Sequence, residues 1–142
     1  MKFLLILLSL TIAQKSCNQS KINQEVISIE YTAASRGFYK QVLINKANVL
    51  VSNKRNEEPI KQNYNADIWE KIIKVLNKVD VKTISNLEAP SKAFQYDGAA
   101  ITRLKIIYDG KTYETPPFDH GNPPKEIEEV VKEILSISEN IE

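Results

Sequence analysis

The sequence has 142 residues, of which 42% are hydrophobic and 26% are charged, so it suits one globular domain with a real core and is not expected to be disordered. Its 19 basic and 18 acidic residues give a formal net charge of +1. This balance excludes the strongly basic face that nucleic-acid binding needs, and it offers no polybasic patch for anionic lipid.

The beginning of the chain indicates export. Lys2 supplies a basic start, and the apolar run from Phe3 to Ile12 is interrupted only by Ser9 and Thr11. The run is about half of the roughly 20 residues that a membrane-spanning helix requires. A basic start, a short apolar core and small residues after it are typical of a secretory signal peptide, which we expect over residues 1–16.

The single cysteine, Cys17, follows this signal directly. An apolar run that ends in a small residue and then a cysteine resembles the lipobox of bacterial lipoproteins; Ser16 matches the box, whereas Gln14 and Lys15 depart from it. The resemblance implies cleavage before Cys17, a diacylglycerol on its thiol and stable attachment to a membrane. Polar residues 18–24 would then form a tether.

A second processing site is also open. Cleavage after Ala13, in a small-x-small pattern, would leave a soluble secreted protein that begins at Gln14. A secreted domain that used disulfides would carry an even set of cysteines, so lipid attachment or a free thiol must explain Cys17. Loss of residues 1–16 removes two lysines and leaves 17 basic against 18 acidic residues, a net charge of about −1.

Three strands are expected in the first part of the domain, which we place at residues 25–142. The first alternates apolar and polar residues, so that Tyr31 and its apolar neighbours share one face. Gly37 gives the following turn its backbone freedom, and a four-residue loop closes the next hairpin. The expected strands are residues 26–32, 38–44 and 49–52.

The first helix is expected over residues 66–79, with Asn65 as its N-cap. Apolar residues recur at spacings of three and four, as in a helix that covers a sheet. Trp69 lies within this stripe, which favours a core position over ligand stacking. The sequence then predicts a short strand or extended segment at residues 81–87 and a loop at residues 88–98.

The last part repeats this order. A strand over residues 99–108, a tight turn at Asp109-Gly110 and a returning strand over residues 111–115 form the expected hairpin. Residues 115–124 contain four prolines and are expected to be irregular. Asn122 is the expected N-cap of the final helix, with the next residue, a proline, as its first helical position.

A hairpin followed by a helix therefore occurs twice, at residues 38–79 and 101–138. This order predicts an α+β fold of two layers, in which a mainly antiparallel sheet carries both helices on one face. It suggests two tandem ββα units that share the sheet. The other face of the sheet would be solvated or used for binding.

The composition excludes several kinds of chemistry. The chain has one cysteine and one histidine, and the cysteine is expected at the membrane, so the two cannot form a credible pair for nucleophilic catalysis. They also cannot supply the four ligands of a structural zinc site. The four glycines are scattered at turns and form no phosphate-binding loop. We expect no cofactor and no metal, and we name no catalytic residue.

Three loops carry the candidate binding residues. Arg36, on a turn flanked by aromatic residues that include Tyr39, could bind a carboxylate or a sugar by forked hydrogen bonds and ring stacking. Tyr96 belongs to a second loop. In the third loop, Asp119 could raise the basicity of His120 and orient its ring. For each loop, an ordinary turn is the favoured alternative.

These observations predict an exported, membrane-anchored lipoprotein that acts as a binding or accessory module of the bacterial cell envelope, on its periplasmic or outer surface. Its partner would be an envelope protein or a small ligand, and not a nucleic acid. One alternative is a secreted hydrolase that uses Asp119 and His120. Another is an inhibitor-like protein whose exposed sheet face docks a secreted enzyme.

Overall fold

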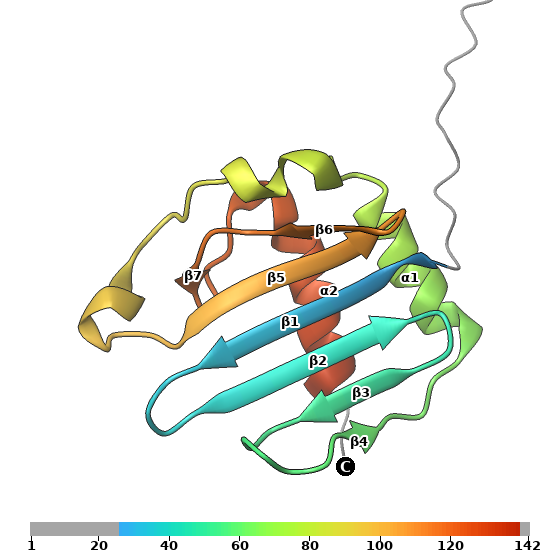
Figure 1. The fold of residues 1–142 in the computed structure, drawn as a ribbon, viewed down its shortest axis with the longest axis horizontal. Coiled ribbons are helices and arrows are strands. Elements are labelled where there is room, and N and C mark those ends of the chain that lie inside the picture. Colours follow the sequence, from blue (N-terminus) through green and yellow to red (C-terminus); the bar gives the residue numbers. More distant parts are fainter. Residues whose placement is uncertain (1–25, 140–142) are drawn as a thin grey trace, which may run out of the picture.

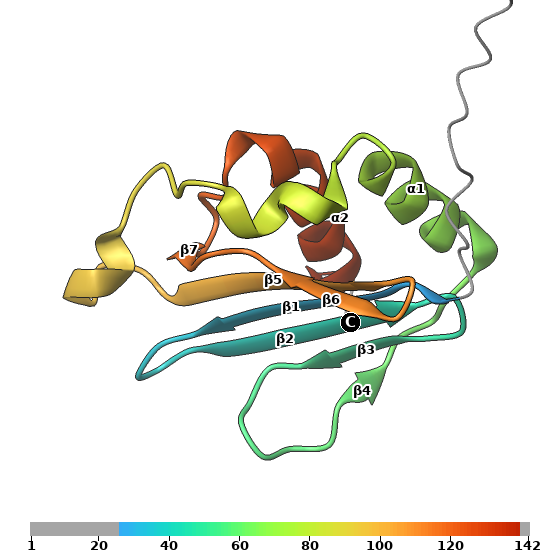
Figure 2. The same ribbon diagram turned by 45° about the horizontal axis from the view of Figure 1, so that its top comes forward.

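The computed structural model describes residues 26–139, so the expected signal peptide, Cys17 and the tether lie outside the described part. An antiparallel sheet forms one layer, and helices α1 (Ala66–Leu76) and α2 (Glu128–Glu139) pack on one of its faces (Figures 1 and 2). The predicted two-layer α+β fold is confirmed.

The sheet has the strand order β4-β3-β2-β1-β5-β6, and β7 pairs with the start of β5. Its strands are β1 (Ser28–Ala34), β2 (Tyr39–Asn45), β3 (Val49–Ser52), β4 (Ile60–Lys61), β5 (Ile101–Tyr108), β6 (Lys111–Glu114) and β7 (Phe118–Asp119). The central strand β1 separates the hairpins β2–β3 and β5–β6. Each hairpin precedes one helix in the chain, so the repeated order of elements is present.

Alternation along the strands builds the core. Tyr31 of β1 lies opposite Val42 of β2 and Leu104 of β5, and all three are fully buried beneath the helices. A second such row passes through Ile29. Removing side chains of this size from water contributes roughly 1.5–3 kcal/mol each. The sheet is therefore held to the helices along its central strands.

One predicted strand is wrong. The segment expected to be extended forms the 3-10 helix η2 (Val81–Asn86), where the Asp80 side chain accepts a hydrogen bond from the backbone N–H of Lys82. Val81 and Ile84 are both buried. Their spacing of three matches the repeat of a 3-10 helix, which brings both side chains to the same face. The segment is too short to show enough repeats of this three-residue period for a 3-10 helix to be recognised in the sequence.

The proline-rich segment also differs from expectation. Residues 118–119 form β7, which is possible because the prolines stand before and after this pair and leave its backbone N–H groups available. Asn122 does not cap the last helix. The chain instead enters α2 through the 3-10 helix η4 (Lys125–Ile127), and a further 3-10 helix, η3 (Ala93–Tyr96), lies in the region expected to be a loop.

Local signals elsewhere are confirmed. Asn65 caps α1 by accepting a hydrogen bond from the Ile68 N–H at 3.0 Å, although α1 ends three residues before its predicted end. Asp109 and Gly110 both have positive φ, as the predicted turn requires. Trp69 is only 4% exposed and belongs to the core.

The sheet has two distinct ends, because β1 runs from Ser28 at one to Ala34 at the other. We call the first the entry end, since the chain before β1 joins the sheet there. We call the second the loop end: it carries the β1–β2 turn, the β3–β4 connection and η3 (Figure 1). Seven residues at about 3.3 Å each place the two ends roughly 20 Å apart.

Candidate functional site

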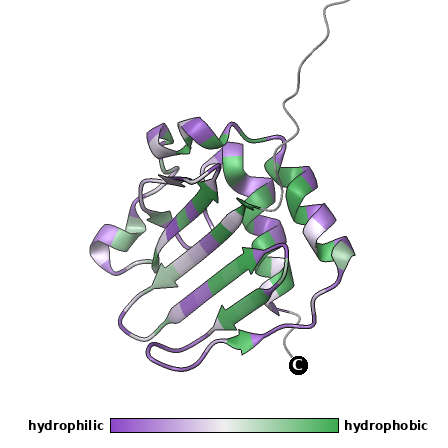
Figure 3. Ribbon diagram, turned by 45° about the vertical axis from the view of Figure 1, so that its right-hand side comes forward, coloured by the Kyte–Doolittle hydropathy of each residue, from purple (hydrophilic) through white to green (hydrophobic). Residues whose placement is uncertain are grey.

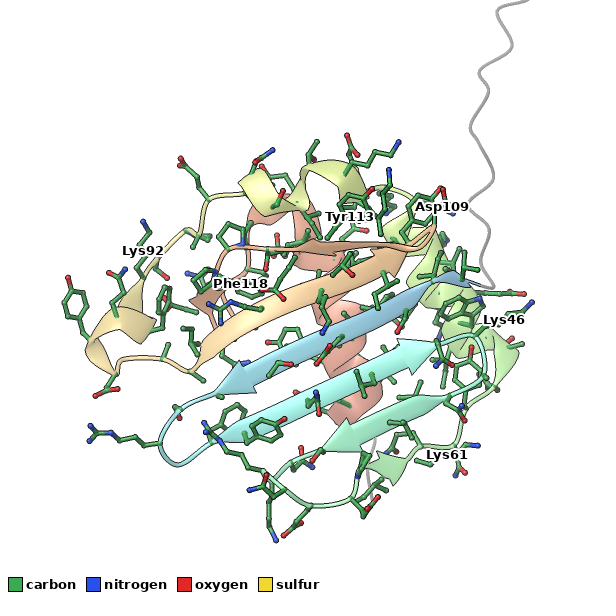
Figure 4. All side chains as sticks on the ribbon, in the orientation of Figure 1. Lys46, Lys61, Lys92, Asp109, Tyr113 and Phe118 are labelled. Carbon is green, nitrogen blue, oxygen red and sulfur yellow. The ribbon has the colours of Figure 1, made fainter. Side chains whose placement is uncertain are left out.

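All five candidate binding residues lie at the loop end. Arg36 and Tyr39 come from the β1–β2 turn and the start of β2, Tyr96 from η3, and Asp119 and His120 from β7 and the residue after it. Of the residues labelled in Figure 4, Lys92 and Phe118 lie toward this end, whereas Lys46 and Asp109 lie at the entry end. Three separate loops of the sequence thus share one surface.

His120 is held from below by the core. Its Nδ1 lies 2.7 Å from the hydroxyl of Tyr31, a fully buried residue. Burial raises the pKa of Tyr31 to about 12, and the neighbouring Thr102 hydroxyl, whose geometry falls short of a hydrogen bond, opposes this rise only in part. Tyr31 is therefore protonated at neutral pH. We assign its hydroxyl as the donor to Nδ1, which leaves the hydrogen of the imidazole on Nε2.

An exposed aromatic ring covers His120 from the other side. The ring centroids of Phe38 and His120 are 5.0 Å apart, with the planes tilted by 45°. Phe38 is 37% exposed, so it joins the surface of the β1–β2 turn to the imidazole and, through it, to Tyr31. The turn is thereby fixed to the core.

Burial lowers the pKa of His120, the positive charge of Lys40 lowers it further, and the negative charge of Glu139 opposes them. The imidazole is therefore neutral at pH 7. This result is the reverse of the sequence-based hypothesis, in which a neighbouring carboxylate raises the basicity of His120.

Asp119 has a different role from the one expected. Its carboxylate accepts hydrogen bonds from the Ser91 hydroxyl, from the Ala93 N–H at 2.9 Å and from the Phe94 N–H at 2.7 Å. Burial alone would raise the pKa of Asp119, but these three donors outweigh it and hold the pKa below its usual value. The hypothesis that Asp119 orients His120 is wrong: Asp119 fastens residues 91–94 to β7.

The β1–β2 turn is braced by an arginine that the sequence did not single out. Arg55 donates from Nη2 to the carbonyl oxygen of Ser35 at 3.3 Å, and its guanidinium lies 5.7 Å from the centre of the Tyr39 ring. The Ser35 N–H also bonds to the Phe38 carbonyl at 2.8 Å. Arg36, at the tip, is exposed and makes no hydrogen bond or ion pair within residues 26–139.

Lys40 is a second residue that sequence reasoning missed. It occupies the same face of β2 as the buried Val42 and Ile44, and this alternation was its signal. Its ammonium donates to the hydroxyl of Ser138 at 3.2 Å, and no carboxylate of the described chain lies within ion-pair distance. Within the described chain, the Lys40 ammonium thus has the Ser138 hydroxyl as its hydrogen-bond partner, and its charge adds to the effect of burial in lowering the pKa of His120.

A groove of about 660 Å³ lies next to this site, between α2 and the residues that lead into it. It is lined by Pro90, Gly121, Asn122, Pro123, Lys125, Glu128, Val131, Lys132, Leu135, Ser136 and Glu139. Glu139 is shared, because it lines the groove and its charge also acts on His120.

The open face of the sheet, which the helices do not cover, has fewer unpaired charged groups than the loop end. Glu30 pairs with Lys105 and accepts a hydrogen bond from Gln41 at 2.8 Å, and the Arg103 and Glu114 side chains are 3.6 Å apart. Hydrophilic and hydrophobic residues follow one another along the strands (Figure 3). The charged groups of this face largely satisfy one another.

No family model matches the chain, and no curated protein or solved structure proved similar to it. In the part of the chain that the structure describes, no helix is both long and apolar enough to cross a membrane. The same residues contain no group of three side chains suited to hold a metal ion.

Proposed function

We propose that this protein is an exported binding module, anchored to the bacterial envelope by lipid on Cys17, and that it binds its partner through the loop end. The observation that carries the proposal is the position of the two ends. The chain that precedes Ser28 joins the sheet at the entry end, roughly 20 Å from the five candidate residues. An anchored domain of this kind directs the loop end away from its membrane.

The build of the loop end supports a binding role. Arg36, Phe38 and Tyr96 are exposed there, and Tyr96 is 84% exposed. Arginine and tyrosine are enriched among the residues that dominate binding energies. Because Arg55 and His120 already hold the β1–β2 turn, little conformational freedom would be lost when a partner binds.

The two alternatives have less support. A hydrolase would need a nucleophile beside His120, yet its described contacts are the rings of Tyr31 and Phe38 and the Tyr31 hydroxyl. An inhibitor-like protein that docked an enzyme through the open sheet face would present charges already paired with one another, such as Arg103 and Glu114. The loop end is the better-equipped surface.

The proposal is tested by capture from envelope extracts with three forms of the immobilised full chain: wild type, Arg36→Ala and Arg103→Ala. Arg103 is a matched control because it is an exposed arginine on the open face. We expect a partner that wild type and Arg103→Ala retain and that Arg36→Ala loses. Equal retention by Arg36→Ala would refute the loop end as the binding surface.

The anchor is tested separately by growing cells with a labelled fatty acid. Label on the wild-type protein and none on Cys17→Ala is the expected result. Wild-type protein without label, or a labelled Cys17→Ala variant, would show that lipid attachment at Cys17 is wrong.

A further inference from the structure

The groove beside α2 has the size of a ligand site. Its volume of about 660 Å³ lies within the roughly 300–1,000 Å³ of most small-ligand pockets. The residues of α2 that line it recur at spacings of three and four from Glu128 to Glu139, so one face of the helix forms its length. On this face Val131 is buried, Leu135 is half-buried, and both pack on the core. The groove therefore has a fixed apolar floor.

The rest of the lining comes from two loops that the structure joins, at Pro90 and at residues 121–123. Asn122 donates from Nδ2 to the hydroxyl oxygen of Ser91 at 2.6 Å, and Ser91 in turn donates to the carboxylate of Asp119. The Asn122 N–H also bonds to the Asp119 carbonyl oxygen at 2.9 Å. Because these contacts already hold the two loops together, little conformational freedom would be lost when a ligand binds.

The charges that line the groove are separated along it. Lys125 and Lys132 lie on the first part with Glu128 between them in sequence, which leaves one net positive charge there. Glu139 places a negative charge at the far end. Within residues 26–139, none of these four side chains forms an ion pair. The arrangement is complementary to a ligand with a carboxylate at one end and an ammonium at the other.

The separation of these charges sets the length of the ligand. Lys132 and Glu139 are seven residues apart on α2, which is about 10 Å along the helix axis. Three residues of extended peptide, at about 3.3 Å each, span the same length. A tripeptide with free ends carries its ammonium and its carboxylate at this separation.

Uncharged polar groups in the lining suit the backbone of a peptide. The Ser136 hydroxyl lines the groove one turn after Lys132, and the Asn122 carboxamide lies on its loop side. In the described part of the chain, Ser136 makes no side-chain hydrogen bond and the Oδ1 of Asn122 accepts none. Peptide N–H and C=O groups need such partners when they leave water. An alkyl chain with charged ends would leave these groups unused.

We infer that the groove along α2 binds a short free peptide of about three residues, with its carboxylate at Lys132, its ammonium at Glu139 and an apolar side chain over Leu135. This site is separate from the surface proposed for the partner, because Arg36 and Phe38 do not line the groove. The peptide would bind whether or not the loop end holds its partner.

The site is tested by NMR titration of the full chain with three peptides: alanyl-leucyl-alanine, its C-terminal amide and its N-acetylated form. We expect the free tripeptide to shift the amide signals of α2 saturably. Each blocked form should bind about threefold more weakly or worse, because each loses one ion pair at a partly exposed site. Equal affinity for the three peptides, or no saturable shift in α2, would overturn the site.

Two substitutions of exposed charges test the direction of the peptide. Lys132→Met should reduce the preference for a free carboxylate and keep the preference for a free amine, and Glu139→Gln should do the reverse. The matched control is Lys74→Met, which removes an exposed lysine of α1 outside the groove and should leave all three affinities unchanged. The opposite pattern in Lys132→Met and Glu139→Gln would refute the assigned direction.

Arg36→Ala separates this site from the loop end, since it should bind the tripeptide as wild type does. If the tripeptide fails to bind while an Arg36-dependent partner is still captured, the peptide site alone is wrong. If the tripeptide binds as expected but Arg36→Ala retains every partner, the loop-end surface is refuted and the peptide site is not. A dimer in sedimentation that the tripeptide dissociates would assign the groove to a second copy of the chain and overturn the proposal.

Discussion

The entry end and the loop end of the sheet are built in different ways. At the entry end, the turns are held by neighbours in sequence. The side chain of Asn45 accepts from the N–H groups of Ala47 and Asn48, both at 2.9 Å. Asp109 and Gly110 close the other hairpin with φ values of 49° and 70°. Local contacts stabilise these turns, which depend little on the rest of the molecule.

At the loop end, the bracing contacts join residues that are distant in sequence. Arg55 reaches Ser35 across 20 positions, and Tyr31 reaches His120 across 89. Such contacts can form only when the strands are paired. The exposed surface at the loop end therefore depends on the core, so changes in the core should alter the proposed binding surface.

The largest effect is expected for Phe118→Ala, which tests whether the loop end depends on the core. Phe118 is fully buried on β7, and its loss should cost about 3–5 kcal/mol of unfolding free energy. Guanidinium denaturation measures this loss. Amide exchange at Ala93 and Phe94, which Asp119 holds, should also accelerate at least tenfold.

The matched variant is Tyr113→Ala on β6, whose half-buried side chain should cost less and leave those two amides protected. If both variants accelerated exchange equally, β7 would not be the element that holds residues 91–94.

A pair of glycines compares the two turns directly. Gly110→Ala places a side chain at a φ of 70° and should cost roughly 1–2 kcal/mol. Gly37 has no atom within 4 Å of an added Cβ and lies outside the left-handed region. Gly37→Ala should therefore leave the unfolding free energy unchanged or raise it by up to about 1 kcal/mol. Urea denaturation of both variants tests whether a glycine is required by the turn at the entry end but not by the turn at the loop end.

Tyr31→Phe removes the hydroxyl under His120 and keeps the ring. The net loss of one buried hydrogen bond should cost about 0.5–1.5 kcal/mol by urea denaturation. Because the pKa of Tyr31 is raised to about 12, its contribution to stability is present below pH 10 and is lost as the pH rises through 12. Tyr31→Phe should abolish this part of the alkaline loss, and an unchanged alkaline profile would contradict the assignment.

The smallest expected effect is at acidic pH. The pKa of His120 is lowered from 6.5, so the unfolded chain takes up its proton at a higher pH than the folded protein. Its contribution is complete above pH 6.5 and declines as the pH falls below that value. The Tm of wild type should drop more than that of His120→Gln between pH 7 and pH 5. A parallel decline in the two proteins would show that the pKa of His120 is not lowered.

The same contrast explains what could be predicted from the sequence. The cap at Asn65 and the turn at Asp109-Gly110 depend on residues a few positions apart, and both were predicted. The site at the loop end depends on Arg55 and Lys40, whose partners are 20 and 98 positions away. No local sequence pattern predicts contacts between residues so far apart in the chain. The alternation along β2 did indicate that Lys40 shares a face with the buried residues of that strand. The proximity of Asp119 to His120 in sequence suggested a pair that does not exist.

The central position of β1 has a mechanical consequence. Seven residues of β1 pair with β2 on one side and seven with β5 on the other. In an anchored protein that holds a partner at the loop end, tension between membrane and partner would run along β1. Both ladders would then be loaded in shear, so that many hydrogen bonds resist together rather than opening one after another. If the proposed anchor precedes β1, this strand is the one best placed to bear a pull.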